Sequence, residues 1–152
     1  MKKYLLIFMT FFILSLLSAD NLSREKAVKA LVDRAEKFYL ENGEQKAFEE
    51  FNKPAGKFVE GELYLFVYDM NGKCFSHGAN KALIGQNLIN LKDPNGKLVI
   101  KELVDIVKKS NEGWSNFIWA HPQTKKNEPK RSYVKRIGKK DILVGCGYYL
   151  EK

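Results

Sequence analysis

The sequence predicts an α+β fold in which a long N-terminal helix packs on a five-stranded antiparallel sheet. Two features of the hydrophobic pattern lead to this fold class. Apolar residues recur at helical spacing over residues 22–41, whereas over residues 63–69 they follow a period of two. Three further β-rich segments close the chain after a second helical stretch, and such segregation of helices and strands is typical of α+β domains.

The N-terminus has the three-part composition of a secretory signal peptide. Two lysines follow the initiator methionine, residues 4–17 are almost entirely apolar, and two small residues come next. This apolar run is shorter than the roughly 20 residues that cross a bilayer as a helix. We therefore expect residues 1–19 to be removed and residues 20–152 to form one periplasmic domain. The alternative is that Leu17, which is large for its place before a cleavage site, leaves the segment uncleaved as an anchor in the inner membrane.

Three helices are expected. The first covers residues 22–41, with apolar side chains at i, i+3, i+7 and i+10. A short helix follows and ends at Asn52, because Pro54 and Gly56 stop helical structure. The third covers residues 97–109 and carries an apolar stripe of its own.

Five strands are expected. Residues 63–69 are apolar on both faces, which indicates a central strand. Asn71-Gly72 is a strong hairpin signal and predicts a returning strand at residues 73–77. Residues 78–96 form a long connection rich in Gly, Asn and Asp, and loops of this length are usually functional. The remaining strands are predicted at residues 114–120, 131–137 and 141–150.

The net charge is +8, and the basic residues are spread along the chain with one denser patch at residues 125–140. A basic patch in a cytosolic protein would indicate nucleic acid, but an exported domain does not meet that partner. The charge instead favours small anions, or it belongs to a solvated hairpin. A second interpretation of the whole chain follows from this patch: a protein-interaction module whose pocket is filled and whose basic hairpin docks an acidic partner or the anionic membrane surface.

No sequence motif indicates an enzyme. Nucleophile elbows, phosphate-binding loops, zinc-protease motifs and dinucleotide fingerprints do not occur. Cys74 and His77 are three residues apart in a predicted strand, so their side chains face opposite sides of the sheet. The two cysteines and two histidines lack metal-ligand spacing. We therefore expect a binding domain without a metal or cofactor.

One face of the predicted sheet has the composition of a ligand site. The alternation in residues 63–68 places Leu63, Leu65 and Val67 against the N-terminal helix and an aromatic set on the opposite face. With the later strands in matching register, that second face carries Tyr64, Phe66, Tyr68, His77, Trp119, Tyr133 and Lys135. Aromatic walls with a few polar tips and one cation suit a small anionic ligand. The alternative is an ordinary aromatic core from which Lys135 reaches solvent.

A set of short motifs occurs in a fixed order between residues 48 and 149. It includes Tyr64–Asp69 followed by Asn71-Gly72, then Leu83–Leu88, Asp93–Lys97, Ser132–Arg136 and Gly145–Tyr149. In this order and spacing the chain resembles the single Cache domain family, the PAS-like extracytoplasmic sensor modules of bacterial chemoreceptors and sensor kinases. The resemblance covers about two-thirds of the chain.

The resemblance implies a PAS-like sheet with a pocket for a short-chain carboxylate such as pyruvate, lactate, acetate or propionate. It points to Tyr68, His77, Trp119, Tyr133 and Lys135 as pocket residues, with Phe66 and Trp114 as walls. Lys135 would balance the ligand carboxylate, and Tyr133 and His77 would donate hydrogen bonds. Because the sequence ends two residues after Leu150, we expect signalling to need a separate membrane receptor, kinase or transporter. The protein is expected to be a monomer or a weak homodimer.

The PAS-like strand order also bears on the cysteines. It places the first strand between the strands that carry Cys74 and Cys146, and strands two apart are separated by about 9–10 Å. This exceeds the limit of about 7 Å between the Cα atoms of a disulfide. A disulfide is therefore not expected, although the periplasm would permit one.

Overall fold

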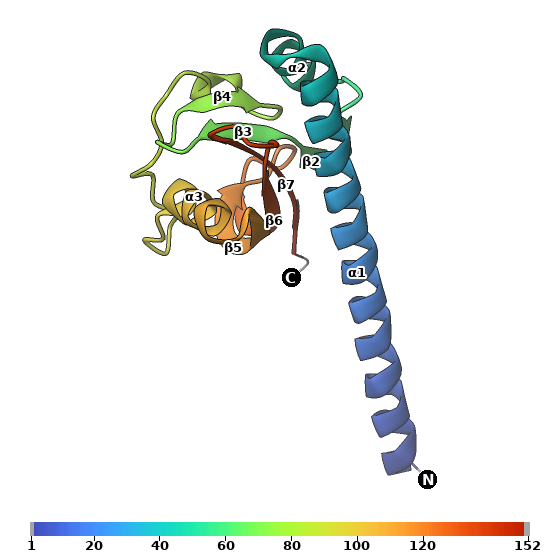
Figure 1. Ribbon diagram of the computed structural model, residues 1–152. Helices are drawn as coiled ribbons and strands as arrows, with labels where there is room; N and C mark the ends of the chain where they lie inside the picture. The colour runs from blue at the N-terminus through green and yellow to red at the C-terminus, as the bar shows by residue number, and fades with distance from the viewer. Residues whose placement is uncertain (1, 151–152) are drawn as a thin grey trace.

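The computed structural model describes the backbone of residues 2–150 and the side chains of residues 20–150 (Figure 1). Two helices at the N-terminus precede four short strands, and a third helix precedes three long strands. In chain order the elements are α1 (Lys2–Asn42), α2 (Glu44–Phe51), β1 (Val59–Glu60), β2 (Leu63–Tyr64), β3 (Phe66–Asp69), β4 (Cys74–His77), the 3₁₀ helix η1 (Lys81–Leu83), α3 (Val99–Ser110), β5 (Glu112–Ala120), β6 (Asn127–Arg136) and β7 (Ile142–Tyr149).

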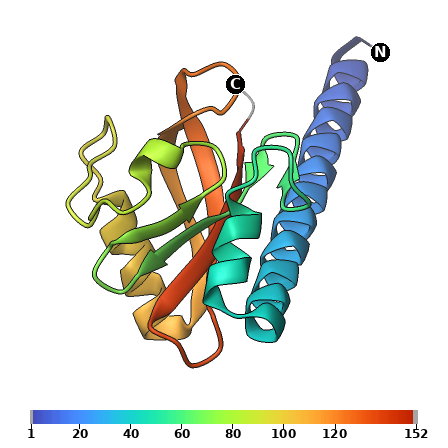
Figure 2. The same ribbon diagram turned by 90° about the horizontal axis from the view of Figure 1, so that it is seen from above.

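The main sheet has five strands in the order β4-β3-β7-β6-β5, with every neighbouring pair antiparallel. Helix α1 packs on one face and α3 on the other (Figures 1 and 2). We call these the α1 face and the α3 face. The predicted α+β fold with a five-stranded antiparallel sheet is confirmed. The small ribbon of β1 and β2 was not predicted. Residues 59–60 are too few to leave a periodic signal, and residues 63–64 were expected to belong to the strand at 63–69.

Helix α1 is continuous from Lys2 to Asn42 and so includes the expected helix at residues 22–41. The same helix extends through residues 2–19 of the predicted signal peptide, whose removal stays a prediction. Residues 20–150 contain no helix that is both long and apolar enough to cross a membrane.

The strand predicted at residues 63–69 is divided at Leu65 into β2 and β3, but its residues alternate between two hydrophobic cores as the sequence predicted. Leu65 and Val67 point to the α1 face, where they pack with the apolar stripe of α1. Tyr64, Phe66 and Tyr68 point to the α3 face and pack with α3. Since successive strand residues alternate between faces, one short strand serves both cores.

The long connection at residues 78–98 is held against the outer strand β5. One carboxylate oxygen of Asp93 accepts from the backbone N–H groups of Asn95 and Lys97, both at 2.9 Å, and the other accepts from Ile118 N–H at 3.0 Å. These backbone hydrogen bonds, chiefly that from Ile118, lower the pKa of Asp93. The Asp93 contact occupies an edge N–H of β5, which protects the sheet edge and fixes the loop over the α3 core.

Both cysteines are buried free thiols. Cys74 lies in β4 and Cys146 in β7, with β3 between them. Burial raises the pKa of Cys74 to about 11 and that of Cys146 to about 12, so both thiols stay protonated and unreactive at neutral pH.

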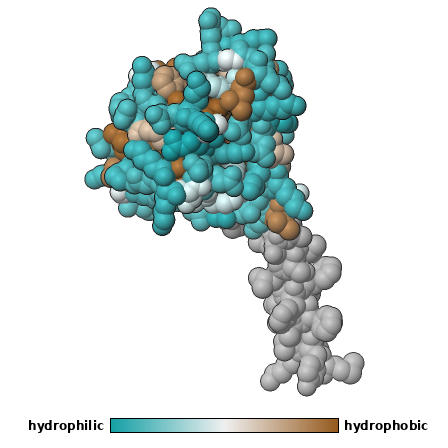
Figure 3. Space-filling model, in the orientation of Figure 1, coloured by the Kyte–Doolittle hydropathy of each residue, from teal (hydrophilic) through white to brown (hydrophobic). Residues whose placement is uncertain are grey.

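The visible surface of the folded domain is mainly hydrophilic, with small scattered hydrophobic groups (Figure 3). Within residues 20–150, Leu22 and Leu40 are the large hydrophobic side chains that are exposed, and both lie on α1. Single exposed leucines of this kind are common on soluble domains and do not by themselves mark an interface.

Candidate ligand-binding site

A cavity lies between the sheet and α3. Its volume is about 10 Å³, which is the space of roughly one water molecule. It is lined by aromatic and aliphatic side chains together with one histidine and one lysine, namely Tyr64, Phe66, Tyr68, His77, Val99, Ile100, Leu103, Phe117, Trp119 and Lys130. We call it the α3-face cavity.

Two glycines of β7 make room for the side chains beside this cavity. A Cβ atom on Gly145 would lie 2.3 Å from the Phe66 ring, and one on Gly147 would lie 2.1 Å from Ser132 Oγ. Neither distance is possible for real atoms, so any other residue would displace these neighbours. At Gly145 and Gly147 no side chain of β7 rises above the sheet. Phe66 of β3 and Ser132 of β6 occupy the space above these two glycines.

Lys130 is the buried cation of the cavity. It is only 1% exposed, and its Nζ lies 3.8 Å from the ring centre of Tyr64 and 4.9 Å from that of Tyr149. Within residues 20–150 its ammonium group forms neither an ion pair nor a hydrogen bond, so the aromatic faces are its electrostatic partners. Burial lowers the pKa of Lys130 to about 7, against a weaker opposing effect of Cys146 and Glu62.

His77 supplies a neutral donor next to this cation. Its Nδ1 accepts from the backbone N–H of Asn80 at 3.0 Å, so the proton of the neutral ring is on Nε2. Burial, followed by the nearby charge of Lys130, lowers the pKa of His77 to about 3. The ring lies between Tyr64 and Trp119, with centroid distances of 5.0 and 6.2 Å. His77 can therefore donate a hydrogen bond from Nε2 without carrying charge.

The tyrosine hydroxyls at one side of the cavity are already used. Tyr149 donates to the carbonyl of Ala120 at 2.7 Å, and Tyr64 donates to the Tyr149 oxygen at 3.3 Å. Burial raises the pKa of Tyr64 well above its ordinary value. These two side chains are fixed walls. Lys130 and His77 are the ionisable side chains of the lining, which also contains the Tyr68 hydroxyl, hydrogen-bonded with Cys74.

The structure brings four of the predicted site residues together around the α3-face cavity: Phe66, Tyr68, His77 and Trp119. The other three lie on the α1 face. Trp114 and Tyr133 are cross-strand partners there, with ring centres 5.2 Å apart. Lys135 reaches α1, where its Nζ lies 2.8 Å from Asp33 and 2.7 Å from Glu36.

The expectation that Tyr133 and Lys135 share a face with Tyr64, Phe66 and Tyr68 is therefore wrong. Pairing of Tyr133 with Cys146 and of Lys135 with Val144 puts the odd-numbered residues of β6 toward α1. A register shift by one residue moves every side chain to the other face, and the sequence does not fix the register of β6 relative to β3.

Lys130 was missed for the same reason. It belongs to the even-numbered set of β6, which also contains the buried Ser132 and Val134. The sequence did contain an indication of the correct orientation of β6. Asp33 and Glu36 lie three residues apart on one side of α1, where both can pair with Lys135. Assigning Lys135 to that pair would have left Lys130 for the cavity.

The basic stretch at residues 125–140 does not form one surface. Lys125 and Lys126 precede β6 and Lys139 and Lys140 follow it, and this strand of 10 residues is about 33 Å long. Between them Lys130 is buried, and Arg131 pairs with Glu25 at 2.7 Å. The structure therefore does not favour a basic docking hairpin.

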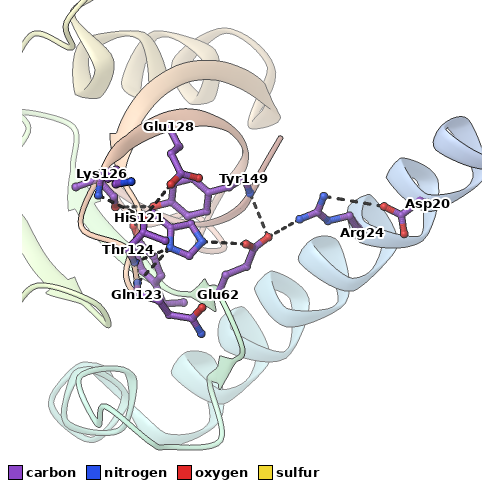
Figure 4. Close-up of polar contacts among 11 residues, drawn as sticks. Asp20, Arg24, Glu62, His121, Gln123, Thr124, Lys126, Glu128 and Tyr149 are labelled. Atoms are coloured by element: carbon purple, nitrogen blue, oxygen red, sulfur yellow. Dashed lines mark hydrogen bonds and ion pairs between the residues drawn. The ribbon is translucent and has the colours of Figure 1, made fainter. Parts of the chain in front are cut away.

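A second polar cluster surrounds Glu62, near the C-terminal end of β7 (Figure 4). One carboxylate oxygen accepts from Arg24 of α1 at 2.6 Å and from the backbone N–H of Tyr149 at 3.2 Å. The other lies 3.3 Å from His121 Nε2, and His121 Nδ1 accepts from the N–H groups of Gln123 and Thr124. Glu62 thus joins α1, β7 and the β5–β6 loop, and we call this the Glu62 cluster.

Residues 23–152 match the family model described as single Cache domain 2. The chain belongs to this family. The resemblance inferred from the ordered motifs is confirmed, and the protein is a Cache sensor domain of the type found in chemoreceptors and sensor histidine kinases.

Two curated proteins are similar to this Cache domain. The sensor histidine kinase MctS of Rhizobium johnstonii is 35% identical over 88 residues, which are 58% of this chain and 19% of that protein. The methyl-accepting chemotaxis protein McpP of Pseudomonas putida is 28% identical over 88 residues, which are 58% of this chain and 16% of that protein. The matched stretch is thus less than a fifth of either relative.

Solved Cache domains share the fold. A methyl-accepting chemotaxis protein from Vibrio parahaemolyticus aligns with a TM-score of 0.77 and 29% identity, covering 91% of this chain and 96% of that chain. A Cache chemosensory domain described for its carboxylic acid recognition aligns with a TM-score of 0.71 and 23% identity, covering 90% of this chain and 97% of that chain.

Proposed function

We propose that this Cache domain is an extracytoplasmic sensor that binds one short-chain monocarboxylate in the α3-face cavity and acts through a membrane receptor, kinase or transporter. The observation that carries the proposal is Lys130, a fully buried cation at the cavity without an anionic partner among residues 20–150. Buried charges are normally paired, so an anion entering the cavity relieves an existing penalty.

The cavity chemistry fits a monocarboxylate. Lys130 supplies the positive charge, and the Nε2–H of neutral His77 supplies a directed hydrogen bond to a carboxylate oxygen. The rest of the lining is aromatic and aliphatic, including Phe117, Trp119 and Leu103, and it suits a short hydrocarbon tail. Among the residues that line the cavity there is one cation, so a second carboxylate would be buried without a partner.

Binding requires the cavity to widen. A space of about 10 Å³ holds about one water molecule and is too small for acids of two to four carbons. Val99, Ile100 and Leu103 form the wall contributed by α3, whereas the opposite walls are strands of the sheet. An outward shift of the first turns of α3, which carry Val99, Ile100 and Leu103, would widen the cavity.

The comparisons support the sensory part of the proposal. The curated relatives are named as a sensor histidine kinase and a chemotaxis protein, and one domain of similar fold is described for carboxylic acid recognition. Export by residues 1–19 and a periplasmic location belong to the same proposal, as does a role in binding rather than catalysis. They rest on the composition of the N-terminus and on the cavity, respectively.

A thermal-shift comparison of acids with their amides tests this function. Acetate, propionate, pyruvate and lactate would be added to the purified protein at pH 6.5, with acetamide and propionamide as uncharged controls of the same shape. We expect at least one acid to raise the melting temperature by several degrees at millimolar concentration and the amides to have no effect. Equal stabilisation by acid and amide, or no stabilisation by any acid, would contradict the proposal.

A further inference from the structure

Trp119 is the residue at which the α3-face cavity meets the surface. Every other residue that lines the cavity is at most 7% exposed, whereas Trp119 is partly exposed. On the inner side its ring centre lies 6.2 Å from that of His77 and 5.9 Å from that of Phe117. On the outer side it borders a groove of about 410 Å³, which is also lined by Leu91, Lys92, Asp93, Pro94, Ile118, Ala120 and Asn127. A molecule that passes from the groove to the cavity therefore passes Trp119.

Residues 91–98 lie along this groove and lead directly into α3. The carbonyl of Leu91 accepts from the N–H of Val99, the first residue of α3, at 3.2 Å, which closes these residues into a loop. Val99 and Ile100 in turn form part of the cavity wall. Because loop and wall are continuous, lifting the loop from β5 would also draw this wall away from the sheet. We call residues 91–98 the edge loop.

Asp93 and Lys97 hold the edge loop on the outer edge of β5. Oδ2 of Asp93 accepts from the N–H of Ile118 at 3.0 Å. Nζ of Lys97 donates to Ser115 Oγ at 3.2 Å and to the carbonyl of Asn116. Both contacts come from side chains rather than from a β-ladder, and they lie at the margin of the sheet. Contacts of this kind can break locally while the rest of a domain stays folded.

The turn of the edge loop occurs a second time in the chain. Residues 69–73 and 93–97 share the pattern Asp-x-Asn-Gly-Lys. In both, Oδ1 of the aspartate accepts from the backbone N–H groups two and four residues later, at 2.8 Å in the first turn and 2.9 Å in the second. Oδ2 of Asp93 also accepts from Ile118, whereas Oδ2 of Asp69 accepts no hydrogen bond within residues 20–150. The turn therefore forms without the second oxygen, and the bond to β5 is a separate role of Asp93.

We propose that the edge loop is a flap that opens the α3-face cavity past Trp119, and that the hydrogen bond from Ile118 N–H to Asp93 is the latch of its closed state. The structure shows the closed state, since a cavity of about 10 Å³ has room for about one water molecule. Opening uncovers Trp119 and withdraws Val99 and Ile100 in one movement, which provides both access and space. The flap would serve any ligand of the cavity, so its test needs no particular acid.

Substitution by asparagine breaks the latch and keeps the turn. In Asp93→Asn the side-chain oxygen stays with the two N–H groups of the turn, and the amide nitrogen faces the N–H of Ile118. An amide nitrogen donates and does not accept, so the bond to β5 is lost. Asp69→Asn makes the same change in the same kind of turn without a latch, and it is the matched control.

The two buried cysteines report where the molecule opens. Cys74 packs in the α3-face core and hydrogen-bonds with Tyr68 of the cavity lining, whereas Cys146 packs in the core of the α1 face. Mass spectrometry would give the initial rate at which each thiol reacts with methyl methanethiosulfonate in the ligand-free protein. We expect Asp93→Asn to increase the Cys74 rate about tenfold, the scale of a hydrogen bond to a charged acceptor, and to leave the Cys146 rate unchanged. Asp69→Asn should leave both rates as in the wild type.

Three results would overturn the flap. The first is a Cys74 rate in Asp93→Asn equal to that of the wild type. The second is the same acceleration in Asp69→Asn, which would trace the effect to the turn rather than to the latch. The third is equal acceleration of Cys74 and Cys146, which would indicate unfolding of the whole domain. Since no ligand is added, these rates decide on the flap even if the proposed function fails.

Discussion

At the level of single residues, the binding chemistry rests on two neighbouring ionisable side chains that burial drives toward their neutral forms. Burial lowers the pKa of Lys130 to about 7 and that of His77 to about 3. Near neutral pH His77 is therefore an uncharged donor, whereas Lys130 is close to its titration point. Since an anion favours the charged ammonium, binding should raise the pKa of Lys130 and take up a proton above pH 7.

This gives a pH dependence with a definite sign. Below about pH 7 Lys130 is charged and an acid binds fully, whereas above this pH the affinity falls by up to about tenfold per pH unit. The pKa of His77, about 3, lies well below this window. Titrations at pH 6 and pH 9 in buffers of different ionisation enthalpy would measure both the affinity and the proton uptake. Tighter binding at pH 9 would contradict the role of Lys130.

At the level of elements, β6 shows what the sequence could and could not predict. The faces of residues 63–68 were predictable, because aliphatic and aromatic residues alternate there and the chain itself fixes which residues share a face. In β6 the even-numbered and the odd-numbered residues each include a lysine and buried side chains. The pattern therefore does not show which of the two sets faces α1 and which faces α3. Pairing with β7 decides it, and this pairing depends on the whole sheet.

A buried lysine is also contrary to the usual distribution of residues. Lysine is rarely buried without a partner, so a sequence argument prefers to leave Lys130 in solvent and to look for a cation elsewhere. The cavity itself could be predicted as an aromatic site on one face of the sheet, but the identity of its cation could not. The space that Gly145 and Gly147 leave above β7 was not predicted either. Its use depends on Phe66 and Ser132, which only the folded sheet brings next to these glycines.

The glycines of β7 provide a test at this scale. Gly145→Ala would place a Cβ atom 2.3 Å from the Phe66 ring and 2.8 Å from Val134. We expect it to lower the free energy of unfolding by about 1–3 kcal/mol, as overpacking does, and to weaken acid binding by displacing Phe66. Urea unfolding and calorimetric titration would measure the two effects.

Gly113→Ala is the matched control for this prediction. Gly113 lies in β5 and pairs with Val134, which also pairs with Gly145. A Cβ atom on Gly113 would lie 2.6 Å from Cγ2 of the partly exposed Ile106 in α3, with no other atom outside the adjoining residues within 4 Å, and it would not meet Phe66. Its effect should be clearly smaller; a larger loss in Gly113→Ala would mean that crowding against Phe66 is not what matters in β7.

For the whole molecule, the sheet separates the candidate ligand site from α1. Helices α1 and α3 lie on opposite sides of the sheet (Figure 2). The α3-face cavity is on one side, and α1 on the other is held by its apolar stripe and by ion pairs to β6 and the β1–β2 ribbon. The Glu62 cluster connects the two sides at the end of β7, because Tyr149 contributes its ring to Lys130 and its backbone N–H to Glu62. It is a polar contact between α1 and Tyr149, a residue next to the cavity.

Two arginines of α1 allow the strength of this connection to be measured. Arg24 pairs with Glu62 at 2.6 Å with both side chains about a quarter exposed, whereas Arg34 pairs with Glu60 at 2.7 Å with both about half exposed. Ion pairs weaken with solvent exposure, so Arg24→Met should reduce the free energy of unfolding by roughly 1 kcal/mol and Arg34→Met by less than about 0.5 kcal/mol. Urea unfolding at low and moderate salt would measure both. Equal losses would show that the Glu62 cluster has no special part in holding α1.

The central claim is that the ligand site lies on the α3 face and that Lys130, not Lys135, is its cation. Calorimetric titration of propionate into the wild type, Lys130→Met and Lys135→Met tests it most directly, because the two lysines are five residues apart on opposite faces of β6. Methionine is unbranched like lysine and only one atom shorter, so it keeps most of the packing and removes the charge. We predict that Lys130→Met abolishes propionate binding while the protein remains folded, and that Lys135→Met binds propionate as the wild type does although it loses its ion pairs to α1. Loss of binding in Lys135→Met with retention in Lys130→Met would contradict the account.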